Sequence, residues 1–310
     1  MLHHFEPGPR RQPRVAVLGA GSWGTTVASI VAESVPTTIW SRRAEVADEI
    51  NSRHVNSCYL EQLPLTPSLI ATGSIEDAVI DADVVVMATP SHGFRDVIEL
   101  AAPNVRPWVP IVSLTKGLEG ATRHRMTEIV NELLPGHPAG VLAGPNLARE
   151  VLQGFAAAAV IAIPDQRVAE ALQELFSGRV FRVYTSQDVV GCEIAGALKN
   201  VVAIAAGMAA GLGTGDNTRA MVITRSLAEL SRLGTAMGGD IRTFAGLAGM
   251  GDLIATCISP LSRNRHVGEQ LALGRKLDDI VSEMGQVAEG VKAAGSVMAL
   301  AGAHRVTMPI

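Results

Sequence analysis

Aromatic residues and excess positive charge are both scarce in this chain. Phenylalanine, tryptophan and tyrosine make up 4% of its 310 residues, which argues against a surface that stacks nucleic-acid bases. Lysine and arginine total 26 against 30 aspartates and glutamates, so no basic excess exists to neutralise the phosphates of a nucleic acid or an anionic membrane. We therefore expect neither nucleic acid nor a membrane surface as a partner.

Cysteine and long apolar runs are scarce too. Cys58, Cys192 and Cys257 are widely spaced and form no CxxC or Cys/His cluster, which argues against a disulfide framework or structural zinc. The histidines show no metal-binding spacing, so no metal is expected.

The longest uncharged stretch, residues 200–215, is shorter than the ~18 residues that a membrane helix needs. Residues 1–13 lack the apolar core of a signal peptide and are interpreted as a disordered lead-in. These features predict a cytoplasmic protein without a membrane span.

What the chain has instead is 47% hydrophobic residues, many of them in short runs of strand length. In the first half these runs alternate with helix-length segments, an order that predicts a doubly wound parallel sheet covered by helices. Most runs are apolar throughout, as in strands buried on both faces. The predicted strands are 14–19, 37–40, 69–72, 83–89, 110–115, 140–144, 157–163 and 180–185, and the predicted helices include 24–34, 42–51, 92–102, 121–134 and 165–177.

The second half changes character after about Thr185. Apolar residues recur there with a 3.6-residue period, which is typical of helices, and strand candidates nearly vanish. Gly234 is expected to end one of these helices as a C-cap. The predicted helices include 194–208, 221–233 and 262–274. We therefore predict two domains, a sheet domain at 14–189 and a mainly helical domain at 190–310.

A glycine-rich turn joins the first predicted strand to the first predicted helix. Gly19, Gly21 and Gly24 form a GxGxxG motif. In this context the first glycine permits a tight turn, the second lets the backbone approach a pyrophosphate, and the third allows close packing of the helix. A purely structural turn is the alternative, but the spacing and position favour a Rossmann-type, dinucleotide-binding sheet.

The residues after the second predicted strand indicate which dinucleotide binds. An acid there would accept a hydrogen bond from the ribose 2′-OH of NAD. Here the run TTIW is followed by Ser41, Arg42 and Arg43, with no acid before Glu45. Two guanidiniums can grip a 2′-phosphate, although they could also be ordinary surface arginines at a helix start. We expect NADP(H) as the favoured coenzyme, with NAD(H) as the alternative.

Lys199 is the only charged residue between Glu193 and Asp216. Its own helical face carries small residues, so we expect this lysine to lie inside a cleft or interface. Burial would lower its pKa from ~10.4 and suit it to general acid–base catalysis. A structural pair with a buried carboxylate is the alternative, and Asp252 is a candidate partner that would make both interpretations compatible.

Two further segments combine polar groups with positions where ligands bind. Residues 115–117, Thr-Lys-Gly, follow a predicted strand at its carboxyl end. Ser262, Arg263 and Asn264 open a predicted helix, so they offer backbone N–H donors, a hydroxyl and a guanidinium to an anion. An ordinary loop cation and an ordinary helix cap are equally open interpretations.

Taken together, the motifs resemble the bacterial NAD(P)-dependent glycerol-3-phosphate dehydrogenase family. In family order they are GAGSWGT at 19–25, ATPSH at 88–92, SLTKGLE at 113–119, AGPNLARE at 143–150, ALKNVVAIAAG at 197–207, GLAGMGDLIATC at 246–257, SRNRHVG at 262–268 and VAEG at 287–290. The resemblance covers about 14–310. The wider superfamily, which includes 6-phosphogluconate and hydroxyacid dehydrogenases, shares the fold that the resemblance implies but not this set of motifs.

The resemblance implies reversible reduction of dihydroxyacetone phosphate to sn-glycerol 3-phosphate, a phospholipid precursor, with Lys199 as proton donor and acceptor. The implied coenzyme contacts are Gly19, Gly21, Ser22, Trp23, Gly24, Arg42, Arg43, Lys116, Ala148, Arg263, Val287 and Glu289. The implied substrate contacts are Lys116, Gly144, Asn146, Lys199, Asn200, Asp252, Thr256, Ser262, Arg263 and Asn264. A homodimer is a candidate assembly.

The chain departs from the family pattern at three places. Asn146 stands where the family usually has serine or threonine, VAEG replaces the VEG of many members, and the chain ends before a terminal segment that most members have. Two other functions stay open: a superfamily reductase for a different keto or hydroxy acid, and a catalytically silent dinucleotide sensor. The anion-binding helix start at Ser262 argues against the first, and Lys199 argues against the second.

Overall fold

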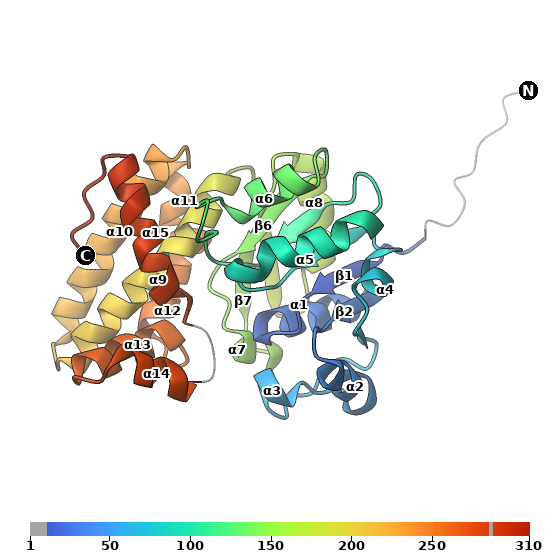
Figure 1. Cartoon of the computed structure of the whole chain (residues 1–310), viewed down its shortest axis with the longest axis horizontal. Coiled ribbons are helices and arrows are strands. Elements are labelled where there is room, and N and C mark those ends of the chain that lie inside the picture. The colour runs from blue at the N-terminus through green and yellow to red at the C-terminus, as the bar shows by residue number, and fades with distance from the viewer. Residues whose placement is uncertain (1–10, 285–287) are drawn as a thin grey trace, which may run out of the picture.

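The computed structural model describes residues 11–284 and 288–310, in which a sheet-bearing part and a helical part lie side by side (Figure 1). Eight strands form one sheet in the order β3-β2-β1-β4-β5-β6-β7-β8. They are β1 (Val15–Leu18), β2 (Thr37–Trp40), β3 (Ile70–Thr72), β4 (Val84–Met87), β5 (Ile111–Ser113), β6 (Ala139–Ala143), β7 (Ala157–Ala162) and β8 (Phe181–Ser186). Each corresponds to one predicted run, so the strand prediction is confirmed.

The prediction of a doubly wound parallel sheet is confirmed with one difference. β1 to β6 run parallel, whereas β7 pairs antiparallel with β6, and β8 runs parallel to β7. The connection between β6 and β7 contains only α7 (Ala148–Leu152), a helix of 5 residues. Such a helix spans about 7.5 Å, less than half the ~17 Å length of a five-residue strand. It is too short to return the chain to the far edge of the sheet, so β7 starts at the near edge and runs back.

Alternate residues of each strand face opposite helical layers, as the two-residue period of a strand requires. In β1, Val15 and Val17 join the core that includes α1 and α8, whereas Ala16 and Leu18 join the core that includes α5 and α6. Because both faces are covered, the strands are apolar throughout. The helices of this part are α1 (Ser22–Ala32), α2 (Ala44–Arg53), α3 (Ser57–Leu60), α4 (Ile75–Val79), α5 (Phe94–Ala101), α6 (Met126–Leu133), α7 and α8 (Gln166–Phe176), with short 3-10 helices η1 (Ser91–Gly93) and η2 (Ala102–Asn104).

Helix α9 (Val189–Gly211) forms the centre of the helical part, and α10, α12, α13 and α15 pack around it. Gly207 and Gly268 bring α9 and α13 together, because a Cβ on either glycine would overlap the backbone of the other helix. By length and composition α9 could cross a membrane, but 78% of its most apolar window is buried inside the fold, as in a core helix. The other elements are α10 (Asp216–Ala236), α11 (Ile241–Ala245), a π-helix η3 (Leu247–Gly251), α12 (Asp252–Ile258), α13 (Arg263–Ala272), α14 (Leu277–Met284) and α15 (Glu289–Ala303).

The expectation that Gly234 ends a helix as its C-cap is wrong. α10 continues to Ala236, and Met237 caps it. A Cβ at position 234 would overlap the ring of Phe244, so this glycine permits helix packing rather than helix termination. The helix predicted to start near Ser262 is confirmed, because the Ser262 Oγ accepts a hydrogen bond from the Arg265 N–H at 3.3 Å and caps α13.

Candidate active site

The glycine-rich turn lies at the carboxyl edge of the sheet, between β1 and α1. Gly19 has φ +125°, and a Cβ there would lie 2.7 Å from the carbonyl oxygen of Ala88. A Cβ on Gly24 would lie 2.7 Å from the Ala88 Cβ. No atom of the described residues lies within 4 Å of the Cβ position of Gly21, so the start of α1 is open there. The turn has the tight bend, the close helix packing and the accessible helix N-terminus that dinucleotide phosphates require.

Ser22 and Trp23 form the first turn of α1. The Ser22 hydroxyl donates to the carbonyl oxygen of Tyr59 at 3.1 Å. The Trp23 ring packs edge-on against Phe181, with ring centroids 5.8 Å apart. Its Nε1 is buried and has no hydrogen-bond partner in the described part of the chain. A buried N–H without a partner costs free energy, so this donor is suited to a bound ligand.

The two arginines after β2 have different surroundings. The Arg43 guanidinium donates to the Cys58 Sγ at 2.7 Å, lies 5.3 Å from the centre of the Tyr59 ring and is 3.8 Å from a Glu45 carboxylate oxygen. Arg42 is exposed, and its side chain contacts no acid among residues 11–284 and 288–310. Arg42 is therefore the arginine whose guanidinium is available to a phosphate.

Asp252 joins two lysines in a buried cluster at the junction of the two parts. Its Oδ1 lies 2.9 Å from the Lys199 Nζ, and its Oδ2 lies 2.7 Å from the Lys116 Nζ. The Lys199 Nζ also donates to the Thr256 Oγ1 at 2.5 Å. Lys199 comes from the middle of α9, Lys116 follows β5, and Asp252 follows the π-helix, a rare element that often marks functional sites. The expected burial of Lys199 is confirmed, and the alternative, a pair with Asp252, is also present, so the two interpretations are compatible.

Burial controls the protonation of Lys199 in this cluster. Lys199 is 5% exposed, and burial lowers its pKa to about 8, with the positive charge of Lys116 acting in the same direction. The negative charge of Asp252 opposes this shift. The amine of Lys199 can therefore exchange a proton near neutral pH while Asp252 holds it in place.

A chain of hydrogen bonds links the start of α15 to α9 and α13. The Asn264 Nδ2 donates to the Asn200 Oδ1 at 3.0 Å, and the Gly290 N–H donates to the Asn264 Oδ1 at 3.0 Å. The Asn200 Nδ2 donates to the Glu289 Oε2 at 3.3 Å. Burial raises the pKa of the Glu289 carboxyl, and the positive charges of Arg263, Lys199 and Lys116 act against that shift. Asn200, Asn264 and Glu289 therefore border the lysine cluster.

The loop after β6 forms another wall of this region. The Lys116 Nζ donates to the carbonyl oxygen of Gly144 at 3.0 Å. Gly144 has φ +145°, and a Cβ there would lie 2.9 Å from the Ala158 carbonyl oxygen. Both amide atoms of Asn146 are buried, and neither has a partner among the described residues. In α7, the carbonyl oxygen of Ala148 accepts a hydrogen bond from the Thr26 hydroxyl at 3.3 Å.

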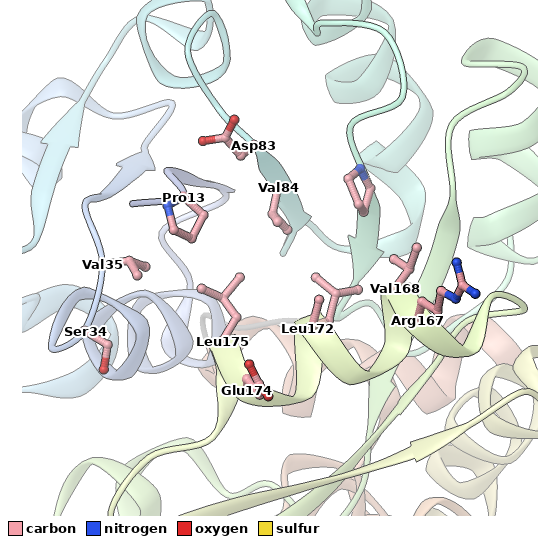
Figure 2. Close-up of a pocket in the computed structure, with 12 residues that line it drawn as sticks. Pro13, Ser34, Val35, Asp83, Val84, Arg167, Val168, Leu172, Glu174 and Leu175 are labelled. Carbon is pink, nitrogen blue, oxygen red and sulfur yellow. The ribbon is translucent and has the colours of Figure 1, made fainter. Parts of the chain in front are cut away.

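A cavity of about 550 Å³ lies at the opposite, amino-terminal edge of the sheet (Figure 2). Leu172 and Leu175 of α8 face Val84 and Pro13 across it, and Asp83, Arg167 and Glu174 also line it. It contains none of the residues predicted for catalysis, coenzyme binding or substrate binding.

The structure thus brings most of the predicted site residues together around the glycine turn, the lysine cluster and the start of α13. Val287 lies outside the described residues. Sequence reasoning missed one basic residue at the same edge, His92, which lies in η1 after β4. Its signal in the sequence is its place in the ATPSH segment at 88–92.

This fold and site define a dinucleotide-binding oxidoreductase with a helical domain that supplies a buried lysine. The matching family models are the NAD-dependent glycerol-3-phosphate dehydrogenase N-terminus, over residues 14–169, and C-terminus, over residues 188–310. The chain belongs to this family.

Individual relatives are similar to this chain over nearly its whole length and carry the name of the same family. A Mycobacterium avium protein named glycerol-3-phosphate dehydrogenase [NAD(P)+] is 60% identical over 97% of this chain and 88% of its own length. A Sphingopyxis alaskensis protein of the same type is 58% identical over 96% of this chain and 89% of its own. The crystal structure of glycerol-3-phosphate dehydrogenase from Coxiella burnetii is similar with a TM-score of 0.91 at 35% identity, covering 96% of this chain and 92% of that one.

Proposed function

We propose that the chain catalyses the reversible reduction of dihydroxyacetone phosphate to sn-glycerol 3-phosphate, with NADPH favoured over NADH. The observation that carries this proposal is the buried Lys199 amine, held by Asp252 at 2.9 Å beside a helix start rich in anion-binding groups. The names of the relatives at 58% and 60% identity support the same reaction.

A nicotinamide coenzyme fits the residues that are present. The tight glycine turn and the orphaned Nε1 of Trp23 mark a region shaped for a ligand. When bound, the coenzyme supplies or takes the hydride. The residues proposed to hold it are Gly19, Gly21, Ser22, Trp23, Gly24, Arg42, Arg43, Lys116, Ala148, Arg263, Val287 and Glu289.

Lys199 is the proposed proton donor. As an ammonium it would hydrogen-bond the ketone oxygen of the substrate and give that oxygen a proton as the carbonyl carbon is reduced. In the reverse direction the neutral amine would take the proton of the C2 hydroxyl. Asp252 fixes the position of the amine, and Thr256 limits its rotation, so the geometry is preorganised.

The start of α13 is the proposed phosphate anchor. Ser262 caps this helix, and Arg263 and Asn264 are its first two residues, so backbone N–H groups, a guanidinium and an amide converge there. Asn146 offers its amide N–H donors and its carbonyl oxygen, and neither amide atom has a hydrogen-bond partner among residues 11–284 and 288–310. The other proposed substrate contacts are Lys116, Gly144, Lys199, Asn200, Asp252 and Thr256.

We place this reaction in the cytoplasm, where its product would feed glycerophospholipid synthesis, and we propose a homodimer as the assembly. The test of the reaction is the oxidation of NADPH, followed by its absorbance, with dihydroxyacetone phosphate as substrate. Unphosphorylated dihydroxyacetone and 2-keto acids are the controls. We expect turnover with the phosphorylated ketone alone, and a protein that binds NADPH without turning over any of these substrates would contradict the proposal.

A further inference from the structure

Asn56 is a buried amide that reaches the glycine-rich turn from the segment between α2 and α3. Its Nδ2 donates to the carbonyl oxygen of Ala20 and to the Thr25 Oγ1, both at 2.9 Å. Ala20 is the residue between the first two glycines of the turn, and Thr25 lies in α1. A single side chain from a distant segment therefore holds both the turn and the helix that follows it.

The oxygen of the same amide is not used within the fold. The Oδ1 of Asn56 is buried and has no hydrogen-bond partner in the part of the chain that the structure describes. A buried polar atom without a partner costs free energy, and an apolar side chain at this position would avoid that cost. Core stability alone therefore does not account for an amide here. What the asparagine adds over an apolar residue is its two bonds to the turn and to α1.

The bond to Ala20 fixes the direction of the next amide group along the chain. The carbonyl of Ala20 and the N–H of Gly21 belong to one trans peptide, so they point in opposite directions. Because Asn56 holds the carbonyl on the buried side, the Gly21 N–H is turned toward the open start of α1. This N–H has no acceptor among residues 11–284 and 288–310. A free donor at this position is suited to the pyrophosphate of a dinucleotide.

Other contacts hold the segment that carries Asn56 against α1. The Ser22 hydroxyl, in the first turn of α1, donates to the carbonyl oxygen of Tyr59 at 3.1 Å. On the other side, the Glu49 Oε2 accepts hydrogen bonds from the N–H and from the hydroxyl of Ser57, both at 2.9 Å. The segment is thus fixed on both sides of the buried amide, so the direction of the Gly21 N–H is set before a ligand binds.

We propose that Asn56 is a positioning residue for coenzyme binding, which turns the Gly21 N–H toward the pyrophosphate of the dinucleotide. The proposal rests on the proposed function only in taking a nicotinamide dinucleotide as the ligand. Asn56 is itself fully buried, so it acts through the turn. NADPH and NADH carry the same pyrophosphate, so loss of the bond to Ala20 must weaken both coenzymes by the same factor.

Thr25 supplies a matched control, because its side chain accepts the other bond of the same amide. We would measure the Kd of NADPH and of NADH by fluorescence, without substrate, for Asn56→Ala and Thr25→Val. Each variant leaves a buried polar group without its partner, so both should lower the melting temperature. Asn56→Ala should raise both Kd values about 10-fold, the lower end of what a hydrogen bond to a charged group contributes. Thr25→Val keeps the bond to Ala20 and should leave both Kd values nearly unchanged.

Hydrogen exchange gives a second readout, which depends on the direction of the Gly21 N–H. In the wild type, either coenzyme should slow the exchange of the Gly21 amide, followed by NMR with ¹⁵N-labelled glycine. In Asn56→Ala saturated with coenzyme, this protection should be smaller. The wild-type measurement needs no variant, so it tests the proposal even if Asn56→Ala fails to fold. A Gly21 amide that exchanges equally fast with and without coenzyme would overturn the assignment.

The affinities can overturn it as well. Unchanged Kd values in a folded Asn56→Ala variant would show that the turn does not need the amide. Equal losses in Asn56→Ala and Thr25→Val would make Asn56 a packing residue for α1. Loss of affinity for NADPH alone would place its effect at the 2′-phosphate, through the segment that contacts Arg43. Since no substrate is present, failure to reduce dihydroxyacetone phosphate would be a separate result.

Discussion

The Oδ1 of Asp252 lies 2.9 Å from the Nζ of Lys199, and this pair joins α12 to the core helix α9. The same carboxylate binds Lys116 through its other oxygen, at 2.7 Å. One negative charge thus holds two positive charges in a buried region, so the cluster keeps a net positive charge. A site of this kind attracts an anionic substrate, and the charge of Lys116 adds to the effect of burial in lowering the pKa of Lys199.

Replacing Lys199 by methionine should abolish most of the catalysis while leaving the fold intact. Methionine fills similar space but cannot transfer a proton, and general acid–base catalysis contributes roughly 100- to 10,000-fold. We expect kcat to fall at least about 100-fold, with the Kd of NADPH close to that of the wild type. Asp252 keeps Lys116 as a partner, so the melting temperature should hold. A variant that retains a tenth of the wild-type kcat would exclude Lys199 as the proton donor.

The pH dependence should follow the protonation of Lys199, whose pKa burial lowers to about 8. Ketone reduction needs the ammonium, so kcat/KM in that direction should fall as the pH rises through this value. Oxidation of glycerol 3-phosphate needs the free amine, so kcat/KM in that direction should rise over the same interval. In Asp252→Asn both transitions should move to lower pH, because the carboxylate raises the pKa of Lys199. Transitions that stay in place in this variant would contradict the assignment.

Glu193 should contribute strongly to stability, since it ties α9 to the first turn of α6. Its buried carboxylate accepts hydrogen bonds from the Thr127 N–H at 2.9 Å and from the Arg125 Nη1 at 2.8 Å. Removing one partner of a buried pair costs about 3–5 kcal/mol. Glu193→Ala should therefore lower the free energy of unfolding by about 3 kcal/mol in a urea titration. As a control, Glu61→Ala, which breaks the exposed pair with Arg149, should change it by less than about 1 kcal/mol.

Arg263→Ala should chiefly weaken the binding of the phosphorylated substrate. A guanidinium–phosphate contact is worth ~1.5–3 kcal/mol, so the KM for dihydroxyacetone phosphate should rise roughly 10- to 150-fold. Added sulfate should compete with this substrate in the wild type and compete less in the variant. If only the coenzyme affinity dropped, Arg263 would belong to the nicotinamide side of the site.

The sequence predicted those features that depend on local pattern. Apolar runs predicted the position of each strand, the glycine spacing predicted the turn, and the isolation of Lys199 in an apolar helix predicted its burial. Its pairing with Asp252 was an open alternative that the structure shows. Periodicity shows that a face is buried, but it does not show which distant segment covers it. The reversal of β7 and the packing of Phe244 on Gly234 both depend on such distant packing, so they emerged only in the structure.

The two arginines after β2 are equivalent in the sequence but have different surroundings in the structure. Arg43 is held by Cys58, Tyr59 and Glu45, whereas the guanidinium of Arg42 has no such partner in the described chain. Arg42→Ala should therefore raise the KM for NADPH roughly 10- to 150-fold and leave that for NADH nearly unchanged, since only NADPH carries the 2′-phosphate. Arg43→Ala should have a smaller effect on NADPH, because a phosphate would have to compete with its existing contacts. Equal losses for both coenzymes in Arg42→Ala would show that this arginine shapes the adenosine pocket instead, and a larger effect of Arg43→Ala would show that its contacts to Cys58 and Tyr59 yield to the phosphate.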